Sequence, residues 1–315
     1  MIRIVFLVLL VTLSSFSKEI KPYRYLSASE AVSDFVRVNN TLVIGTEEGT
    51  VEVYDLKKDK LLDKITLPKY KNILGDDMRS LILSVDYYKG KILFIGRVLD
   101  GYRELYLYED GKLRTLITHE QQTTIQKVKF IDENTALLQS MGNEIILFDI
   151  KASKRLKVKQ LNFSSFSDFV LSEDKKYVYT ADETPLVSQI DLNSFKIIKE
   201  FKKANKRDIF SVDFKNKVLL TGGKDRRVIA YKSLNDYTMT KGDFFIYSVA
   251  LNPKASLVAF VKNEENDISV VGTSTMKEKY LLKGHNQTVI KIDFYSKNEL
   301  ISADERNRIF FWRLD

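Results

Sequence analysis

The sequence contains no cysteine among its 315 residues. Disulfides, thiolate nucleophiles, iron–sulfur clusters and cysteine-based zinc sites are therefore excluded together. Only two histidines occur, His119 and His285, and they lie far apart along the chain. This scarcity argues against a histidine-rich metal site and against any mechanism that needs several imidazoles. We therefore expect a protein that is not an enzyme and that holds neither a cofactor nor a metal ion.

Long hydrophobic runs are also scarce, and the one that stands out covers residues 4–13. It follows a short positive start at Arg3 and precedes small residues at Ser15 and Ser17, which is the layout of a secretory signal peptide. A retained membrane anchor is the alternative, but the run is shorter than the roughly 20 residues that span a bilayer. We expect a signal peptide at residues 1–17, with a mature periplasmic protein that begins at Lys18.

A repeated pattern fills the rest of the chain. Each copy has two apolar residues separated by two positions, followed by a polar turn and a second run rich in β-formers. The copies recur about every 43 residues, within the 40–45 residue period of a four-stranded propeller blade. The seven apolar pairs are Val32 and Phe35, Ile82 and Val85, Ile125 and Val128, Phe166 and Phe169, Ile209 and Val212, Ile246 and Val249, and Val289 and Ile292.

Within each copy the pattern predicts short strands. In the fifth copy, residues 211–214, 218–221 and 228–231 read as three strands, and the turn cluster 222–226 separates the last two. Evenly spaced short strands are typical of a sandwich, a barrel or a propeller, and the fixed period favours the propeller. We therefore predict an all-β fold, a single seven-bladed β-propeller over residues 18–315.

The last copy resembles the WD40 repeat family. It carries Gly284 and His285, then Ser302, then Trp312, at the family spacing. The resemblance implies that His285, Ser302 and Trp312 form a hydrogen-bonded network inside the blade. In the family an aspartate six positions before the tryptophan completes that network, and here that position is Arg306. We interpret these residues as structural, with no role in ligand binding.

The fifth copy matches the family differently. Thr221 and Asp225 match, Tyr231 replaces the tryptophan, and Ala204-Asn205 stands where the Gly-His pair belongs. The repeat is therefore WD40-like but eroded.

The ring also needs to be closed. The last copy ends at residues 312–315 without its outermost strand, while residues 21–27 alternate like a strand before the first copy. We predict that this N-terminal strand completes the last blade, so that no long open edge remains.

Positive charge is concentrated in the fifth copy. The formal net charge is +8, and two basic clusters dominate the region 196–241. Aromatic residues follow close by. We take the following as candidate partner-binding residues: Lys202, Lys203, Lys206 and Arg207, then Lys224, Arg226 and Arg227, then Phe244, Phe245 and Tyr247. An acidic protein surface suits such a patch. Charge that serves only solubility is the alternative, and the export signal argues against nucleic acid.

Three functions remain open. The first is a periplasmic protein-interaction platform, the second a propeller hydrolase or lactonase-type enzyme, and the third an outer-membrane protein assembly scaffold. Taken over its whole length, the chain resembles the NapL family, the accessory proteins encoded with periplasmic nitrate reductases in some bacteria. That resemblance implies a non-catalytic role in assembly of, or electron delivery to, a nitrate reductase component, and it carries over no site residue. We expect a monomer without stable membrane insertion.

Overall fold

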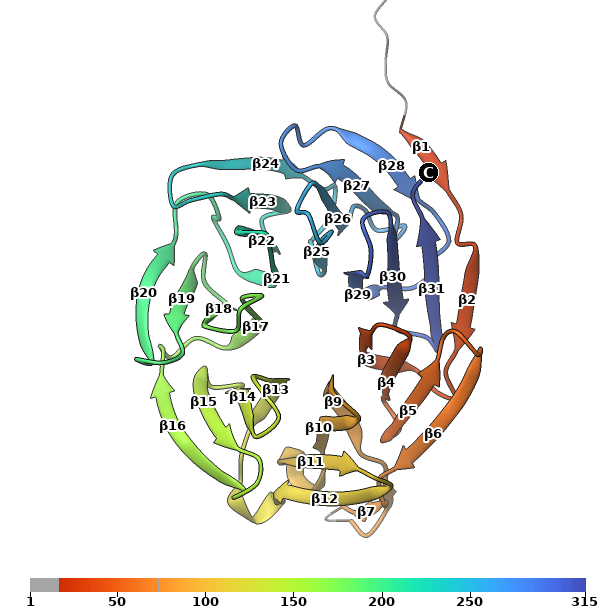
Figure 1. Ribbon diagram of the computed structural model, residues 1–315, viewed down its shortest axis with the longest axis vertical. Helices are drawn as coiled ribbons and strands as arrows, with labels where there is room; N and C mark the ends of the chain where they lie inside the picture. Colours follow the sequence, from red (N-terminus) through yellow and green to blue (C-terminus); the bar gives the residue numbers. More distant parts are fainter. Residues whose placement is uncertain (1–16, 73) are drawn as a thin grey trace, which may run out of the picture.

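The computed structural model describes residues 17–72 and 74–315. The described residues form seven β-sheets of four or five strands, arranged around a central channel (Figure 1). The predicted all-β, seven-bladed propeller is therefore confirmed. The predicted signal peptide, apart from Ser17, lies outside the described residues.

Each blade has four antiparallel strands, ordered from the channel outward. Blade 1 has β3 (Val32–Val38), β4 (Thr41–Thr46), β5 (Thr50–Asp55) and β6 (Lys60–Thr66). Blade 2 has β9 (Leu81–Tyr88), β10 (Lys91–Arg97), β11 (Arg103–Glu109) and β12 (Lys112–Ile117). Blade 3 has β13 (Ile125–Phe130), β14 (Thr135–Ser140), β15 (Glu144–Asp149) and β16 (Lys154–Gln160). Blade 4 has β17 (Phe166–Leu171), β18 (Tyr177–Asp182), β19 (Val187–Asp191) and β20 (Lys196–Phe201).

The remaining blades contain the C-terminal half of the chain and its N-terminal strands. Blade 5 has β21 (Ile209–Lys215), β22 (Val218–Gly223), β23 (Arg227–Tyr231) and β24 (Tyr237–Lys241). Blade 6 has β25 (Val249–Leu251), β26 (Leu257–Val261), β27 (Ile268–Gly272) and β28 (Glu278–Leu282), with β1 (Lys18–Ile20) at its edge. Blade 7 has β29 (Val289–Phe294), β30 (Glu299–Asp304), β31 (Arg308–Arg313) and β2 (Arg24–Ser27).

Other structure in the described residues is slight. A hairpin of β7 (Tyr70–Lys71) and β8 (Asp77–Met78) lies between blades 1 and 2. Two 3-10 helices are present: η1 (Leu99–Gly101) lies in the turn between β10 and β11, and η2 (His119–Gln121) lies in the connection from blade 2 to blade 3. Over the described ranges, no helix is long and apolar enough to cross a membrane.

The apolar core lies between the blades. Seven clusters of buried side chains are present in the described structure, and each joins two successive sheets. The second strand of a blade is nearly all buried because neighbouring sheets cover both of its faces, whereas the outermost strand β16 is almost wholly exposed. Propeller strands therefore read as short apolar runs near the channel and as polar, lysine-rich runs at the rim.

Two glycines show how closely the sheets approach. A Cβ atom at Gly45 would lie 2.6 Å from Cγ2 of Ile82 in the next blade. A Cβ atom at Gly222 would lie 2.5 Å from Cγ2 of Ile246, again in the next connection along the ring. Contacts this short are not tolerated between carbon atoms, so the missing side chain allows the inner strand of the next blade to pack directly on the second strand.

The N-terminal segment closes the ring as predicted. Strand β2 pairs antiparallel with β31, with Arg24 opposite Phe311 and Ser27 opposite Arg308. The strand is shorter than the predicted 21–27 because Pro22 lacks an amide hydrogen and the first ladder contact is made by Tyr23, whose N–H donates to the Phe311 carbonyl at 3.0 Å.

The segment before β2 makes a second closure that the sequence did not reveal. Strand β1 pairs parallel with β28 of blade 6, with Ile20 opposite Leu282. Lys283 donates to Glu19 across this pair at 2.6 Å. Residues 18–27 therefore join blade 6 as well as blade 7, and Figure 1 shows β1 lying close to the C-terminus.

Stepwise truncation should separate the two closures. Removing residues 18–20 from the mature chain deletes only the parallel edge strand and should lower the melting temperature slightly. Removing residues 18–27 also uncovers the edge of β31 and loses the buried Leu26. Burial of one such side chain contributes about 1.5–3 kcal/mol, so we expect a fall of about 5 °C or more. Calorimetry of the three chains checks this, and equal melting temperatures would contradict closure by β2.

Candidate functional site

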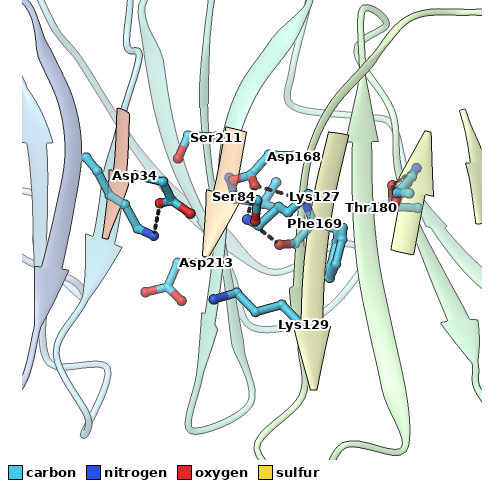
Figure 2. Close-up of polar contacts among 12 residues, drawn as sticks. Asp34, Ser84, Lys127, Lys129, Asp168, Phe169, Thr180, Ser211 and Asp213 are labelled. Atoms are coloured by element: carbon cyan, nitrogen blue, oxygen red, sulfur yellow. Dashed lines mark hydrogen bonds and ion pairs between the residues drawn. The ribbon is translucent and has the colours of Figure 1, made fainter. Parts of the chain in front are cut away.

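The central channel is lined by polar side chains from one register position. The position lies in each innermost strand, or directly before it in blade 6, and it immediately precedes the second apolar residue of the repeat. Its occupants, in ring order, are Asp34, Ser84, Lys127, Asp168, Ser211, Ser248 and Lys291. They surround a cavity of about 460 Å³. Figure 2 shows several of them pointing from neighbouring strands into this space.

Each of these side chains bonds to the backbone of the next blade. The aspartates and serines accept from an N–H: Val85 to Asp34 at 2.9 Å, Val128 to Ser84 at 3.2 Å, Val212 to Asp168 at 2.9 Å, Val249 to Ser211 at 3.2 Å and Ile292 to Ser248 at 2.9 Å. The two lysines donate to a carbonyl: Lys127 to Phe169 at 2.9 Å and Lys291 to Phe35 at 2.6 Å. All seven junctions of the ring are therefore held by the same position.

The lysines stand where the next blade presents an aspartate. The Asp34 carboxylate already accepts from the N–H of Phe35 at 2.9 Å, so that amide is not free to bond the preceding blade. Lys291 instead bonds the Phe35 carbonyl and forms an ion pair with Asp34 at 2.7 Å. Lys127 and Asp168 repeat the arrangement (Figure 2). Lysine therefore precedes aspartate at both junctions.

A second tier lies two positions further along the strands. Lys129 forms an ion pair with Asp86 at 2.8 Å, and Asp86 also accepts from the N–H of Phe130 at 2.7 Å. Burial alone would lower the pKa of Lys129, but the carboxylates of Asp86 and Asp34 outweigh burial and raise the pKa. Lys129 therefore stays charged inside the channel.

Two aspartates in the channel titrate in opposite directions. Burial would raise the pKa of Asp34, but Lys291, Lys129 and the hydrogen bonds overcome burial and lower it. Burial raises the pKa of Asp293, and the positive charges of Lys291 and Lys215 do not offset it. Asp293 has neither a hydrogen bond nor an ion pair through its side chain to another described residue. One carboxylate therefore stabilises the ring at neutral pH and the other opposes it.

These opposite directions predict opposite effects of the same substitution. Because the folded pKa of Asp34 is depressed, its contribution is present above the ordinary aspartate pKa of about 3.9 and is lost as the pH falls through the lower folded value. Asp34→Asn should therefore destabilise by about 2–3 kcal/mol at pH 7, with a smaller loss under acidic conditions. Urea unfolding between pH 8 and pH 3 measures it.

Asp293→Asn is the matched control in the same channel. Its folded pKa is raised, so its ionised form destabilises the protein above that pKa and has no effect below about pH 3.9. The substitution should increase stability at pH 7, and the increase should vanish in acid. Equal effects of the two asparagine variants would contradict the assignment of the two charges.

A second cavity opens at one end of the channel. It measures about 790 Å³ and shares Ser167, Phe210, Tyr247 and Ile290 with the channel lining. Its walls come from blades 4 to 7, at the end where the connections between blades and the turns between second and third strands lie. We call this end the upper face and this space the upper cavity. The remaining lining residues are Phe244, Val261, Asn263, Glu264, Asn266, Thr288, Val289 and Glu305.

Aromatic rings form one wall of the upper cavity. Phe210 stacks on Tyr247 with ring centroids 5.5 Å apart, and Phe244 lies 6.3 Å from Tyr247. Phe245 stacks on Phe244 at 4.8 Å and meets Phe210 edge-on at 6.4 Å. Tyr247 is 38% exposed. The predicted aromatic residues are therefore brought together, and Phe210 completes their cluster.

The two predicted basic clusters meet beside this aromatic wall. The N–H of Lys206 donates to Asp225 at 2.8 Å, and Arg227 donates to the Ala204 carbonyl at 2.7 Å. The next connection is attached in turn, because the N–H of Gly242 donates to the Arg226 carbonyl at 2.9 Å. Basic and aromatic residues therefore form one continuous part of the upper face. We call the seven cations Lys202, Lys203, Lys206, Arg207, Lys224, Arg226 and Arg227 the basic patch.

Local acids partly neutralise the basic patch. Lys202 pairs with Glu200 at 3.5 Å, Lys224 with Asp208 at 3.0 Å and Arg227 with Asp225 at 3.7 Å. The other four cations form no ion pair with a described residue. All four are exposed in the structure: Lys203, Lys206, Arg207 and Arg226.

The structure brings His285, Ser302 and Trp312 into hydrogen-bonding contact. His285 Nε2 lies 2.7 Å from Ser302 Oγ, and Trp312 Nε1 donates to the same oxygen at 2.8 Å. The carboxylate partner is Asp304, 2.8 Å from His285 Nδ1, and not the residue at position 306. Gly284 lies outside the network, where a Cβ would be 3.1 Å from Pro22 and 3.3 Å from Trp312.

Blade 5 builds an equivalent network around Asn205. Its amide bonds Thr221 at 3.1 and 3.2 Å, and the Tyr231 hydroxyl donates to its oxygen at 2.9 Å. Asp225 is not in this network, since it accepts from the N–H groups of Lys206 and Arg227 instead. Asn205 thus takes the place that His285 has in blade 7, and Asp225 holds the loop that carries the basic patch.

Truncation of His285 should lower the stability of the protein because it removes the hydrogen-bonded network of blade 7. The side chain is fully buried and bonds two partners, so His285→Ala should lower the unfolding free energy by about 1–3 kcal/mol. The other histidine, His119, is 41% exposed, and His119→Ala should cost less. Urea unfolding measures both, and a larger loss for His119→Ala would contradict the structural role of His285.

A tyrosine, a glutamate and a histidine meet on blade 2. Tyr106 donates to Glu104, and His119 Nδ1 lies 2.7 Å from the same carboxylate. The hydrogen bond to Glu104 raises the pKa of His119, and burial followed by the same carboxylate raises that of Tyr106. None of the three lines the channel or the upper cavity. Their contacts fix the connection after β12.

Sequence reasoning missed several residues of the site. Glu264 and Glu305 lie in separate turns, and only the ring brings them to one cavity. Phe210 directly follows the first apolar residue of its repeat, as Tyr247 does in the next, and this shared position could have placed it beside Tyr247. The side chains that link the blades also share one position in every repeat. This shared position could have predicted from the sequence that they line the channel.

Comparison with protein-family models finds no match to this chain, and comparison with curated protein sequences finds no significant match. In the part of the chain that the structure describes, no group of three or more histidine, aspartate or glutamate side chains is arranged to hold a metal ion.

Proposed function

We propose that this protein is a non-catalytic protein-interaction platform, and that its upper face is the binding surface. The observation that carries the proposal is the continuity of the basic patch, the aromatic cluster and the upper cavity across blades 4 to 7. Aromatic side chains commonly anchor protein interfaces, and exposed cations speed the encounter with an acidic partner. The backbone hydrogen bonds between connections and turns hold this surface ready to bind.

We further propose a WD40-like repeat family, a periplasmic location and a role toward one class of partner. The repeat pattern and the network around His285 support a WD40-like ring, and the signal-like residues 1–17 support work in the periplasm. The overall resemblance to the NapL family supports an accessory role toward a periplasmic nitrate reductase component, in its assembly or in electron delivery. Capture from a periplasmic extract with the tagged mature chain, followed by mass spectrometry, tests this role. Recovery of no reductase subunit, with normal nitrate reduction in a deletion strain, would overturn it.

Charge reversal on the upper face should slow association with the captured partner. The triple variant Lys203→Glu, Arg207→Glu and Arg226→Glu removes unpaired cations of the basic patch. We expect an association rate several-fold lower at low salt, with little difference at high salt. Stopped-flow or surface-based kinetics at two ionic strengths measures the change.

The opposite face supplies a control of equal charge change. Lys57, Lys151 and Lys254 are exposed in the turns at the other end of the strands. Their reversal to glutamate should slow association less, because the charges lie further from the proposed surface. Equal slowing by the two triple variants would show that net charge alone acts, and would contradict binding at the upper face.

A further inference from the structure

We propose that the upper cavity receives an arginine side chain of the protein partner. The inference rests on the proposed function, because it specifies what the upper face of the platform recognises. It combines three features of the cavity: an aromatic wall, two carboxylates free of ion pairs within the described structure, and a bordering basic patch.

The aromatic wall offers ring faces to a cation. Phe210 and Tyr247 are nearly parallel, with 8° between their planes, and Phe244 is tilted against Tyr247 by 59°. All three are partly exposed at the cavity. A planar guanidinium stacks on such faces and is attracted by their negative charge density.

Carboxylates and amides also line the upper cavity. Glu264 and Glu305 are exposed, and neither forms an ion pair with a described residue. Their turns are fixed: Asn263 accepts from the N–H of Asp267 at 2.9 Å, and the N–H of Glu305 donates to the Thr288 carbonyl at 3.0 Å. Two carboxylates on fixed turns, without a paired cation in the described structure, suit the forked donors of arginine better than the single ammonium of lysine.

Size and surroundings extend the inference to the residues beside the arginine. A cavity of about 790 Å³ is large enough for a side chain with part of its backbone. The connection that carries Phe244 and Tyr247 is bonded through Gly242 to the turn of Arg226 in the basic patch. A partner segment with its arginine in the cavity therefore lies next to positive charge, so we expect acidic residues beside that arginine.

Three capped pentapeptides test this recognition. The first reads glycine–aspartate–arginine–aspartate–glycine, the second has citrulline in place of arginine, and the third has norleucine. Citrulline keeps the shape and removes the charge, and norleucine keeps only the apolar stem. Titration of the mature protein, followed by calorimetry and by the tyrosine ring signals in NMR spectra, should show the arginine peptide binding at least about tenfold more tightly than the other two.

Variants of the cavity locate the interaction. Glu264→Gln and Glu305→Gln should each weaken binding of the arginine peptide several-fold and leave binding of the citrulline peptide unchanged. Phe244→Leu keeps an apolar contact but removes the ring, and should weaken the arginine peptide alone. Glu183→Gln is the matched control, since Glu183 is exposed in the corresponding turn of blade 4 but does not line the cavity. Melting temperatures verify that each variant is folded.

The outcomes separate this inference from the proposed function. Equal affinity for the three peptides, or tightest binding of the norleucine peptide, would overturn recognition of arginine and identify an apolar pocket. No binding of the arginine peptide, or binding unaffected by both glutamine variants, would also overturn it. If a partner is still captured and depends on the basic patch, the platform stands without this pocket. If the peptide binds but no partner is captured, the proposed function fails instead.

Discussion

The ring depends on one repeated interaction: a polar side chain on each innermost strand bonds the backbone of the next blade. Seven apolar clusters hold the sheets together, but apolar contact alone does not fix how far one sheet slides along another. The side chains at this position provide that registration because each meets one particular N–H or carbonyl. The lysines at two junctions show the constraint clearly. Where an aspartate such as Asp34 satisfies its own neighbouring amide, the preceding blade offers a donor instead of an acceptor.

This registration also positions the upper face. Connections between blades end directly before the innermost strands, so fixing those strands fixes the loops that carry the aromatic wall and the basic patch. The turns add their own restraint: Asp225 and Arg227 bond the loop at Ala204 and Lys206 rather than solvent. A surface built this way would lose little conformational freedom on binding the partner proposed above, which would favour affinity. The charges that remain unpaired are therefore displayed on a rigid support, and the acids that pair with the others limit how positive the patch becomes.

The fold was predictable from sequence because every blade repeats the same apolar spacing, and because the incomplete last copy required the N-terminal strand. The details depend on contacts between distant residues, and spacing alone does not reveal these. Asp304 takes the role of the expected aspartate because its carboxylate, two positions earlier in the chain, reaches Nδ1 of His285. Asn205 replaces histidine because its amide can also bond a hydroxyl on either side. Strand β1 was missed because its three residues, 18–20, lie before Pro22 and are too few to show an alternating pattern. The upper cavity could not be predicted from the sequence because its lining residues come from four blades and meet only in the folded ring.

The double attachment of the N-terminal segment has a consequence for how the chain folds. Glu19 and Lys283, which meet across the β1–β28 pair, are 264 positions apart. Blades 1 to 5 can form from neighbouring residues as hairpins, but blades 6 and 7 are finished only when the two ends of the polypeptide meet. Contacts between such distant positions form slowly. Until they do, two unpaired strand edges stand open to other chains. The last step of folding is thus the pairing of the N-terminal strands with β28 and β31. Until that step, association with other chains would begin at the unpaired edges of these two strands.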